Sequence, residues 1–113
     1  MNKAIIFHGT GETPNSFWYP WLATQLRGRG YTVEVPHYPD INQMPVADFL
    51  PQVLQNHTFD DNTILIGHSA GGPLILSLLE RIDAVIPQAI LVAGFSTESN
   101  HEPENPILQD HYD

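Results

Sequence analysis

The apolar residues of this chain follow two alternating spacings, which predict strands and helices in turn. Short runs that are almost wholly apolar predict buried strands at residues 3–8, 31–35, 63–66 and 89–93. Apolar residues at helical spacing predict helices over residues 16–29, 45–57 and 74–82. Pro51 lies inside the second helix, and the pattern leaves open whether that helix begins near Pro51 or kinks there. Alternating apolar strands and helices predict an α/β fold, a three-layer αβα sandwich with a mostly parallel sheet.

Residues 96–113 break this pattern. They contain five acidic residues, neither lysine nor arginine, and only Ile107, Leu108 and Tyr112 as large apolar residues. We expect this stretch to be an acidic tail, either an exposed loop or a loosely packed flap. The 113 residues together have the length of a single domain.

Composition and charge exclude several classes of function. Hydrophobic residues make up 42% of the chain and charged residues 15%, which is typical of a globular protein. Thirteen acidic residues against four basic ones give a net charge of −9, which argues against binding to nucleic acid or to an anionic membrane. No apolar run approaches the ~20 residues of a membrane span. The absence of cysteine fits a reducing compartment, and we expect a cytoplasmic protein.

Neither the histidines nor any other residues form a recognisable cofactor or metal site. None of the six histidines lies three or four residues from another, and the chain has no cysteine to complete a zinc site. We therefore expect no metal and no cofactor.

One motif carries recognisable chemistry. Residues Gly67, His68, Ser69, Ala70 and Gly71 match G-x-S-x-G, between a predicted strand and a predicted helix. This is the setting of a nucleophile elbow, in which a sharp turn strains the serine backbone and the two glycines relieve the crowding. The serine oxygen then projects at the head of a helix, where developing negative charge is favoured. The alternative is an ordinary glycine-rich turn with an idle serine.

A second loop could complete such a site. The first predicted strand ends in the sequence His8-Gly9-Thr10-Gly11, where a hydrolase would supply an oxyanion donor. We expect the backbone amides of Thr10 and Ala70 to be the two donors. The loop alone is equally typical of an ordinary connection with turn glycines. His8 and His68 flank the site, and we expect structural roles for both.

Four segments, in this order and spacing, resemble a known family. They are His8-Gly9, the aromatic stretch 17–22, the elbow 67–73 and the segment 90–95. Over nearly the whole chain they resemble the small serine hydrolases of the retinoblastoma-binding-protein-nine type, a branch of the α/β-hydrolase superfamily. The aromatic residues Phe17, Trp18, Tyr19 and Trp21 are expected in the core more than in a substrate pocket.

The resemblance implies Ser69 as nucleophile and a definite strand order. The first predicted strand should lie between the second and the third, with the fourth beyond the third. The chain then reverses direction between the first and third strands, and parallel sheets bind ligands at such a switch point.

The chain departs from that family after the fourth strand. Family members carry their acid after a further strand and their histidine in a Gly-His segment, whereas only 44 residues follow Ser69 here. No strand ending in aspartate and no Gly-His pair follows Phe95, so no residue is assigned as acid or base. His101 and His111, near Asp110 and Asp113, could reach the elbow on a flap or be solvated loop residues.

Three functions therefore remain open. The first is a serine hydrolase of the esterase type, acting on a small ester or amide substrate and incomplete as 113 residues. The second is a non-catalytic binding or regulatory protein that keeps the scaffold. The third, a phosphate- or nucleotide-binding domain, ranks last because both G-x-x-x-x-G-K and G-x-G-x-x-G are missing.

The fourth predicted strand bears on possible partners. Residues 89–93 are apolar and would form a free sheet edge, which favours pairing with a second copy or a complementing chain. We expect the chain to be a fragment, a natural truncation or one piece of a split protein.

Overall fold

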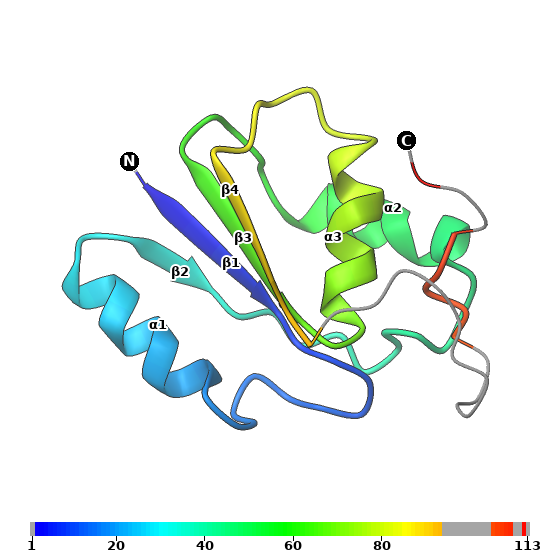
Figure 1. Ribbon diagram of the computed structural model, residues 1–113, viewed down its shortest axis with the longest axis horizontal. Coiled ribbons are helices and arrows are strands. Elements are labelled where there is room, and N and C mark those ends of the chain that lie inside the picture. Colours follow the sequence, from blue (N-terminus) through cyan, green and yellow to red (C-terminus); the bar gives the residue numbers. More distant parts are fainter. Residues whose placement is uncertain (1, 94–104, 110–111, 113) are drawn as a thin grey trace.

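The computed structural model describes residues 2–93, 105–109 and 112. Along the chain, four strands alternate with three helices: β1 (Lys3–Phe7), α1 (Tyr19–Gly28), β2 (Thr32–Glu34), α2 (Val46–Asn56), β3 (Thr63–His68), α3 (Gly71–Leu79) and β4 (Gln88–Val92). The strands form one parallel sheet in the order β2-β1-β3-β4. Both the α/β fold and the strand order expected from the resemblance are confirmed (Figure 1).

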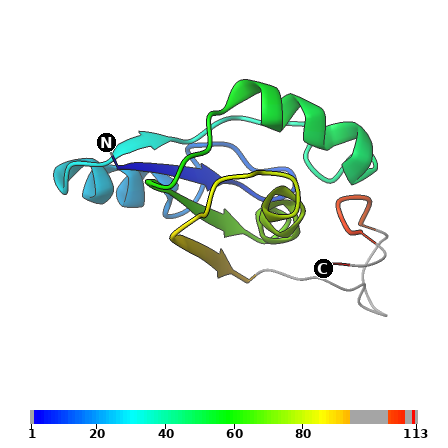
Figure 2. The ribbon, with the colours of Figure 1, turned by 90° about the horizontal axis from the view of Figure 1, so that it is seen from above.

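The helices cover the two faces of the sheet unequally. Helices α2 and α3 lie on one face, and α1 lies alone on the other (Figures 1 and 2). Residues of β1 point alternately to the two sides, as the strand period of two requires. Ile5 and Phe7 therefore join the core under α2 and α3, whereas Ala4 and Ile6 join the smaller core under α1. From Ala4 to Phe7, both faces of β1 are thus fully buried, as in other parallel sheets.

Helix α2 passes through Pro51 rather than beginning there. It starts at Val46, directly after Pro45, and Pro51 lies in the middle of it on the exposed side. A proline at this position removes one backbone donor from the helix. The buried residues Phe49, Leu50 and Val53 hold the helix against the core on the other side. Packing of this apolar side therefore outweighs the poor helix propensity of one proline.

The aromatic stretch before and within α1 is only partly core, so the expected core position is wrong for Phe17 and Trp21. Tyr19 is fully buried and Trp18 is half-buried, but Phe17 is 72% and Trp21 is 64% exposed. These side chains are exposed because α1 covers only the β2 side of this face of the sheet and leaves the β4 side open (Figure 1).

Residues 105–109 are not an exposed tail. Ile107 is fully buried in the core under α2 and α3. Its amide donates to the side-chain oxygen of Asn42 (3.0 Å), and the Val46 amide donates to the Pro106 carbonyl (3.1 Å). An exposed loop, one of the two forms expected for this stretch, therefore does not describe residues 105–109. Residues 96–104, 110–111 and 113 lie outside the described part of the chain.

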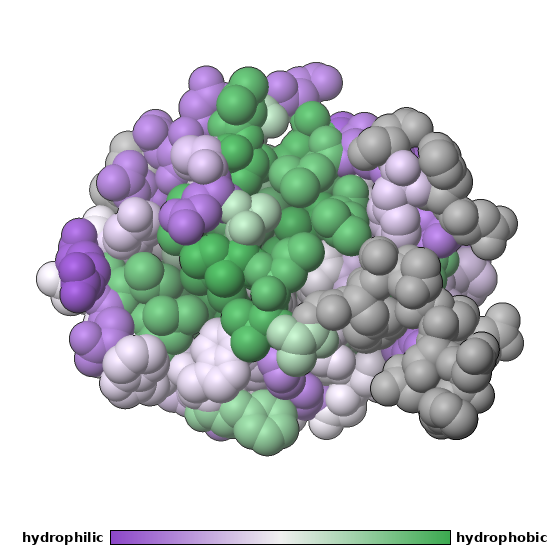
Figure 3. All heavy atoms as spheres, viewed as in Figure 1, coloured by the Kyte–Doolittle hydropathy of each residue, from purple (hydrophilic) through white to green (hydrophobic). Residues whose placement is uncertain are grey.

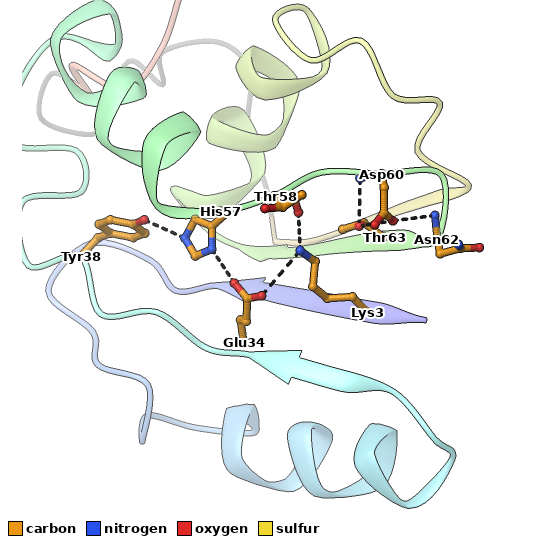
Figure 4. A network of polar contacts seen from close by, with 8 residues as sticks. All are labelled: Lys3, Glu34, Tyr38, His57, Thr58, Asp60, Asn62 and Thr63. Atoms are coloured by element: carbon orange, nitrogen blue, oxygen red, sulfur yellow. Dashed lines mark hydrogen bonds and ion pairs between the residues drawn. The ribbon is translucent and has the colours of Figure 1, made fainter. Parts of the chain in front are cut away.

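A polar network ties β1 and β2 to the end of α2 (Figure 4). Glu34 contacts His57 Nδ1 at 2.6 Å and Lys3 Nζ at 3.6 Å. His57 Nε2 contacts the Tyr38 hydroxyl at 2.8 Å. The His57 side chain is only 5% exposed, so this network is structural in character. None of the helices in the described ranges is long and apolar enough to cross a membrane.

Candidate active site

Ser69 lies on a strained turn between β3 and α3. Its φ of 53° is in the left-handed region, which costs a residue with a side chain about 1–2 kcal/mol. Two hydrogen bonds hold this backbone: the Ser69 amide donates to the Val92 carbonyl (3.0 Å), and the Gly72 amide donates to the Ser69 carbonyl (2.9 Å). The serine is only partly buried. A positive φ at this point, between a strand and a helix, is the backbone conformation that a nucleophile elbow requires.

Glycine is required on both sides of this serine. A Cβ on Gly67 would lie 2.5 Å from the Gly71 carbonyl oxygen, and a Cβ on Gly71 would lie 2.4 Å from the Phe7 carbonyl oxygen. Both distances are too short for non-bonded contact with backbone. The spacing of the motif therefore follows from close backbone contacts of β3, α3 and β1.

The loop after β1 packs directly against the elbow. A Cβ on Gly9 would lie 3.0 Å from the Ser69 Cβ and 3.1 Å from the His68 carbonyl oxygen. The Gly9 amide donates to Glu12 Oε1 (2.8 Å), so it is not free to bind a ligand. Within the described ranges, neither the Thr10 amide nor the Ala70 amide donates a hydrogen bond. These two amides are the donors that the sequence predicts for an oxyanion hole.

Glu12 fixes the shape of this loop. Its Oε1 accepts hydrogen bonds from the Gly9 amide and from the Tyr19 hydroxyl, and it lies 3.1 Å from His68 Nδ1. Burial raises the pKa of Glu12, but the hydrogen bonds from Tyr19, Gly9 and His68 outweigh burial and lower it below its usual range. The carboxylate is therefore ionised at neutral pH and is a strong acceptor for all three donors.

His68 Nδ1 is engaged with Tyr19 and Glu12. Its Nδ1 lies 2.8 Å from the Tyr19 hydroxyl, whose single proton goes to Glu12. His68 Nδ1 must then carry a proton and act as donor in this cluster. That nitrogen cannot accept the Ser69 proton.

His8 has both ring nitrogens engaged in backbone hydrogen bonds. Its Nε2 accepts from the Tyr38 amide (2.8 Å), which leaves the proton on Nδ1 to be donated to the Gly9 carbonyl (2.8 Å). Burial lowers the pKa of His8, so the imidazole is neutral in the folded protein. The structural role expected for His8 fits this arrangement, since the ring joins the β1 loop to the segment that follows β2.

Asn42 connects the Thr10 loop to residues 105–107. It lies at a φ of 61°, and its Nδ2 donates to Thr10 Oγ1 (3.1 Å) and to Asn105 Oδ1 (2.8 Å). Its Oδ1 accepts from the Ile107 amide. One nearly buried amide side chain therefore holds the candidate oxyanion loop and a distant segment in fixed relation.

The sequence did not identify Glu12, Tyr19 or Asn42 as parts of this site. Glu12 and Asn42 lie in irregular loops, and Tyr19 acts through its contact with one of these loops, so no periodic signal identifies them. A φ above zero at Asn42 is the one local preference that could have suggested it, since asparagine tolerates this conformation.

The described residues do not supply a complete catalytic triad. His101, His111, Asp110 and Asp113, which the sequence raised as possible substitutes, lie outside those residues. Among the residues that can be described, no group of three or more histidine or acidic side chains could hold a metal ion.

Comparison with known proteins places the chain in context. It is 34% identical over 100 residues to the curated Bacillus subtilis protein named "Putative hydrolase YdeN", and the match covers 85% of this chain and 53% of that protein. The chain thus spans about half the length of this relative. The crystal structure of the B. subtilis ydeN gene product superposes with a TM-score of 0.74 at 33% identity, with the same coverage of 85% and 53%.

A more distant structure shares the fold alone. It is an extracellular α/β-hydrolase from a Paenibacillus species, described as sharing structural and functional homology with tobacco salicylic acid binding protein 2. The TM-score is 0.65 at 22% identity, over 87% of this chain and 43% of that one. The family described as "Serine hydrolase" matches residues 4–111, nearly the whole chain. The chain therefore belongs to the serine hydrolase family.

Proposed function

We propose that this chain carries the nucleophile and oxyanion hole of a serine hydrolase that transfers acyl groups from small esters or amides. The observation that carries the proposal is the left-handed backbone of Ser69 at the head of α3. Such strain is costly, and it persists where a site requires the side chain to project from a sharp turn. Membership of the serine hydrolase family supports this assignment.

The proposed chemistry begins with attack of Ser69 Oγ on the substrate carbonyl carbon. The carbonyl oxygen gains negative charge, which the Thr10 and Ala70 amides would stabilise with the N-terminus of α3. Collapse of the tetrahedral intermediate breaks the bond to the leaving group and leaves an acyl-serine, which water then hydrolyses. The residues Glu12 and Asn42 contribute by holding the Thr10 loop in place.

A general base must take the Ser69 proton in this scheme. His68 Nδ1 and both ring nitrogens of His8 are already engaged, as described above. We propose that the base and its acid come from sequence equivalent to the part of the relatives that this chain does not span. We also propose that the chain belongs to the branch of small serine hydrolases of the retinoblastoma-binding-protein-nine type. Only the order of the sequence motifs supports this assignment.

The second candidate function is a non-catalytic binding protein on the same scaffold. The engaged ring nitrogens of His8 and the engaged Nδ1 of His68 favour it, because a serine without a base is a weak nucleophile. An oxyanion hole and binding alone still leave about 10³–10⁴-fold acceleration over water when a triad member is missing. A hydrolase site that lacks only its base should therefore still react slowly with a strong electrophile, whereas a non-catalytic scaffold should not react.

The test is labelling of the purified chain by a fluorophosphonate probe, followed by intact mass. We expect one adduct per chain, absent from Ser69→Ala and retained in Ser77→Ala. Ser77 is a matched control because its hydroxyl is buried in α3 without a hydrogen-bond partner among the described residues. A folded chain with no adduct, or an adduct that survives Ser69→Ala, would favour the non-catalytic function.

A further inference from the structure

Phe17 combines two features that are each unfavourable. Its apolar ring is 72% exposed to solvent. Its φ of 51° is in the left-handed region, where a bulky side chain is rarely found. Burial of the ring does not compensate for this strain, and glycine, asparagine and aspartate are the residues that adopt such a φ readily. Strain that the fold does not explain is characteristic of functional sites.

Hydrogen bonds on both sides hold Phe17 in this conformation. The Ser16 amide donates to the Thr13 carbonyl (3.0 Å), and the Thr13 amide donates to Ser16 Oγ (3.0 Å). The Tyr19 amide then donates to the Ser16 carbonyl (3.2 Å), so this bond spans Phe17. The ring is therefore presented by a fixed turn directly before α1.

The ring lies beside the candidate nucleophile. Its centroid is 5.7 Å from the centroid of the His68 ring, and His68 directly precedes Ser69. Phe17 also makes an edge contact with the ring of Tyr19, at 6.5 Å. Hydrogen bonds with Tyr19 and Glu12 fix the His68 ring in turn. The His68 side chain is 19% exposed, so the rings of Phe17 and His68 present one aromatic surface to solvent, which we call the Phe17 wall.

The lysine and arginine residues of the chain all lie at the other end of the sheet. They are Lys3 at the start of β1, Arg27 and Arg29 at the end of α1, and Arg81 after α3. The Phe17 wall lies at the carboxyl-terminal end of the strands, where α1 and α3 begin (Figure 1). Glu12, which contacts His68, adds a negative charge there. An anionic group at the wall would therefore meet a carboxylate and neither a lysine nor an arginine.

We propose that Phe17 is a specificity-determining residue for the reaction at Ser69: the Phe17 wall binds an uncharged apolar substituent, alkyl or aryl, next to the scissile bond and disfavours an anionic one. This inference rests on the proposed function, since it assigns the substrate class of the same site. An apolar substituent would cover the exposed ring, and an aryl group would also make edge or offset contacts with it. A carboxylate in the same place would lose water without gaining a cationic partner.

The Phe17 wall is separate from the larger apolar surface of the molecule. Figure 3 shows hydrophobic side chains gathered over β4 in the middle of the view. A groove of about 440 Å³ lies between α1 and this strand, and Trp21 lines it whereas Phe17 does not. The side chain of Trp21 is 64% exposed. Trp21→Ala is therefore a matched control, because it removes another exposed aromatic ring without changing the wall.

The test measures binding without catalysis. The Ser69→Ala chain, labelled with ¹⁵N, is titrated with 3-phenylpropanamide, an uncharged amide with an aryl group, and binding is followed by the chemical shifts of backbone amides. We expect the largest shifts around Phe17 and His68. In the same background, Phe17→Ala should raise the dissociation constant about tenfold, as for other losses of apolar contact in a binding site. Trp21→Ala should leave it unchanged, and 3-(4-carboxyphenyl)propanamide should bind at least tenfold more weakly than the uncharged amide.

A second variant separates loss of the ring from loss of the turn. Phe17→Asn removes the apolar ring but places at this φ a residue that tolerates it, so it should fold and still bind about tenfold more weakly. Circular dichroism shows whether each variant is folded. The proposal is overturned if 3-phenylpropanamide does not bind, if Phe17→Ala and Phe17→Asn bind it as tightly as the Ser69→Ala chain, or if the two amides bind equally.

The two remaining outcomes are also decisive. Weaker binding to Trp21→Ala, with unchanged binding to Phe17→Ala, would place the ligand in the groove and overturn the proposal. Because the titration uses Ser69→Ala, its result does not depend on a reactive serine. Failure of the Phe17 wall and failure of fluorophosphonate labelling of the unmodified chain are therefore separate results.

Discussion

At the scale of single residues, the elbow depends on two glycines rather than on the serine alone. Gly67→Ala would place a methyl group 2.5 Å from the Gly71 carbonyl oxygen and 2.8 Å from Ile75 Cδ1. We expect a loss of about 2–3 kcal/mol in the free energy of unfolding, as for other overpacked sites. Urea denaturation followed by tryptophan fluorescence measures this. Gly28→Ala is the control: it lies at the end of α1 with open space around it, and alanine there should be neutral or stabilising. Equal losses in both variants would contradict the account.

His8 makes stability depend on pH in a definite direction. Burial lowers its pKa in the folded state below the ordinary value of 6.5, so the folded protein favours the neutral ring. Below pH 6.5 the unfolded chain then binds a proton that the folded chain does not. Stability from this residue is full above pH 6.5 and falls as the pH drops toward the folded-state value, by at most about 1.4 kcal/mol per pH unit. His8→Gln should reduce this slope between pH 7.5 and 5 in urea denaturation, because glutamine does not titrate. An unchanged slope would show that His8 is not responsible.

At the scale of elements, regular structure could be read from the sequence and irregular contacts could not. Apolar periodicity predicted the order of all seven elements, because strands and helices bury their apolar sides at fixed spacings. The strand order came from the resemblance. The path of α2 through Pro51 was left open, since it depends on how firmly Phe49 and Val53 are packed. The burial of Ile107 was missed because one isoleucine in an acidic stretch has no period, and its docking depends on Asn42.

The candidate site also has one part that the sequence predicts and one part that it does not. The position of Ser69 and its glycines follows from a motif whose spacing is set by backbone contact. Glu12 lies in a loop and contacts Tyr19 in the first turn of α1 and His68 at the end of β3. These partners are 7 and 56 positions away from Glu12 in the sequence. Such contacts depend on the tertiary fold, so no local pattern could predict them.

At the scale of the whole molecule, the strongly negative charge and the exposed apolar strand β4 have opposite effects on association between copies of the chain. At pH 7.5 the net charge of −9 keeps chains apart, while the side of β4 that no described residue pairs with favours contact between them. Salt removes the first effect, because the screening length falls from about 30 Å at 0.01 M to about 3 Å at 1 M. We therefore expect the isolated chain to be monomeric in low salt and to form weak, concentration-dependent oligomers in 1 M salt, as measured by light scattering.

The contact responsible for that association can be identified by two variants of equal charge. Leu91→Lys places a charge on β4, where charged side chains discourage pairing between edges, and it should keep the chain monomeric in 1 M salt. Val85→Lys changes the net charge by the same amount outside the strand, so it should associate like the unmodified chain. If both variants stay monomeric, reduced solubility in salt rather than pairing of β4 would explain the association. If both variants associate, the contact lies elsewhere on the surface.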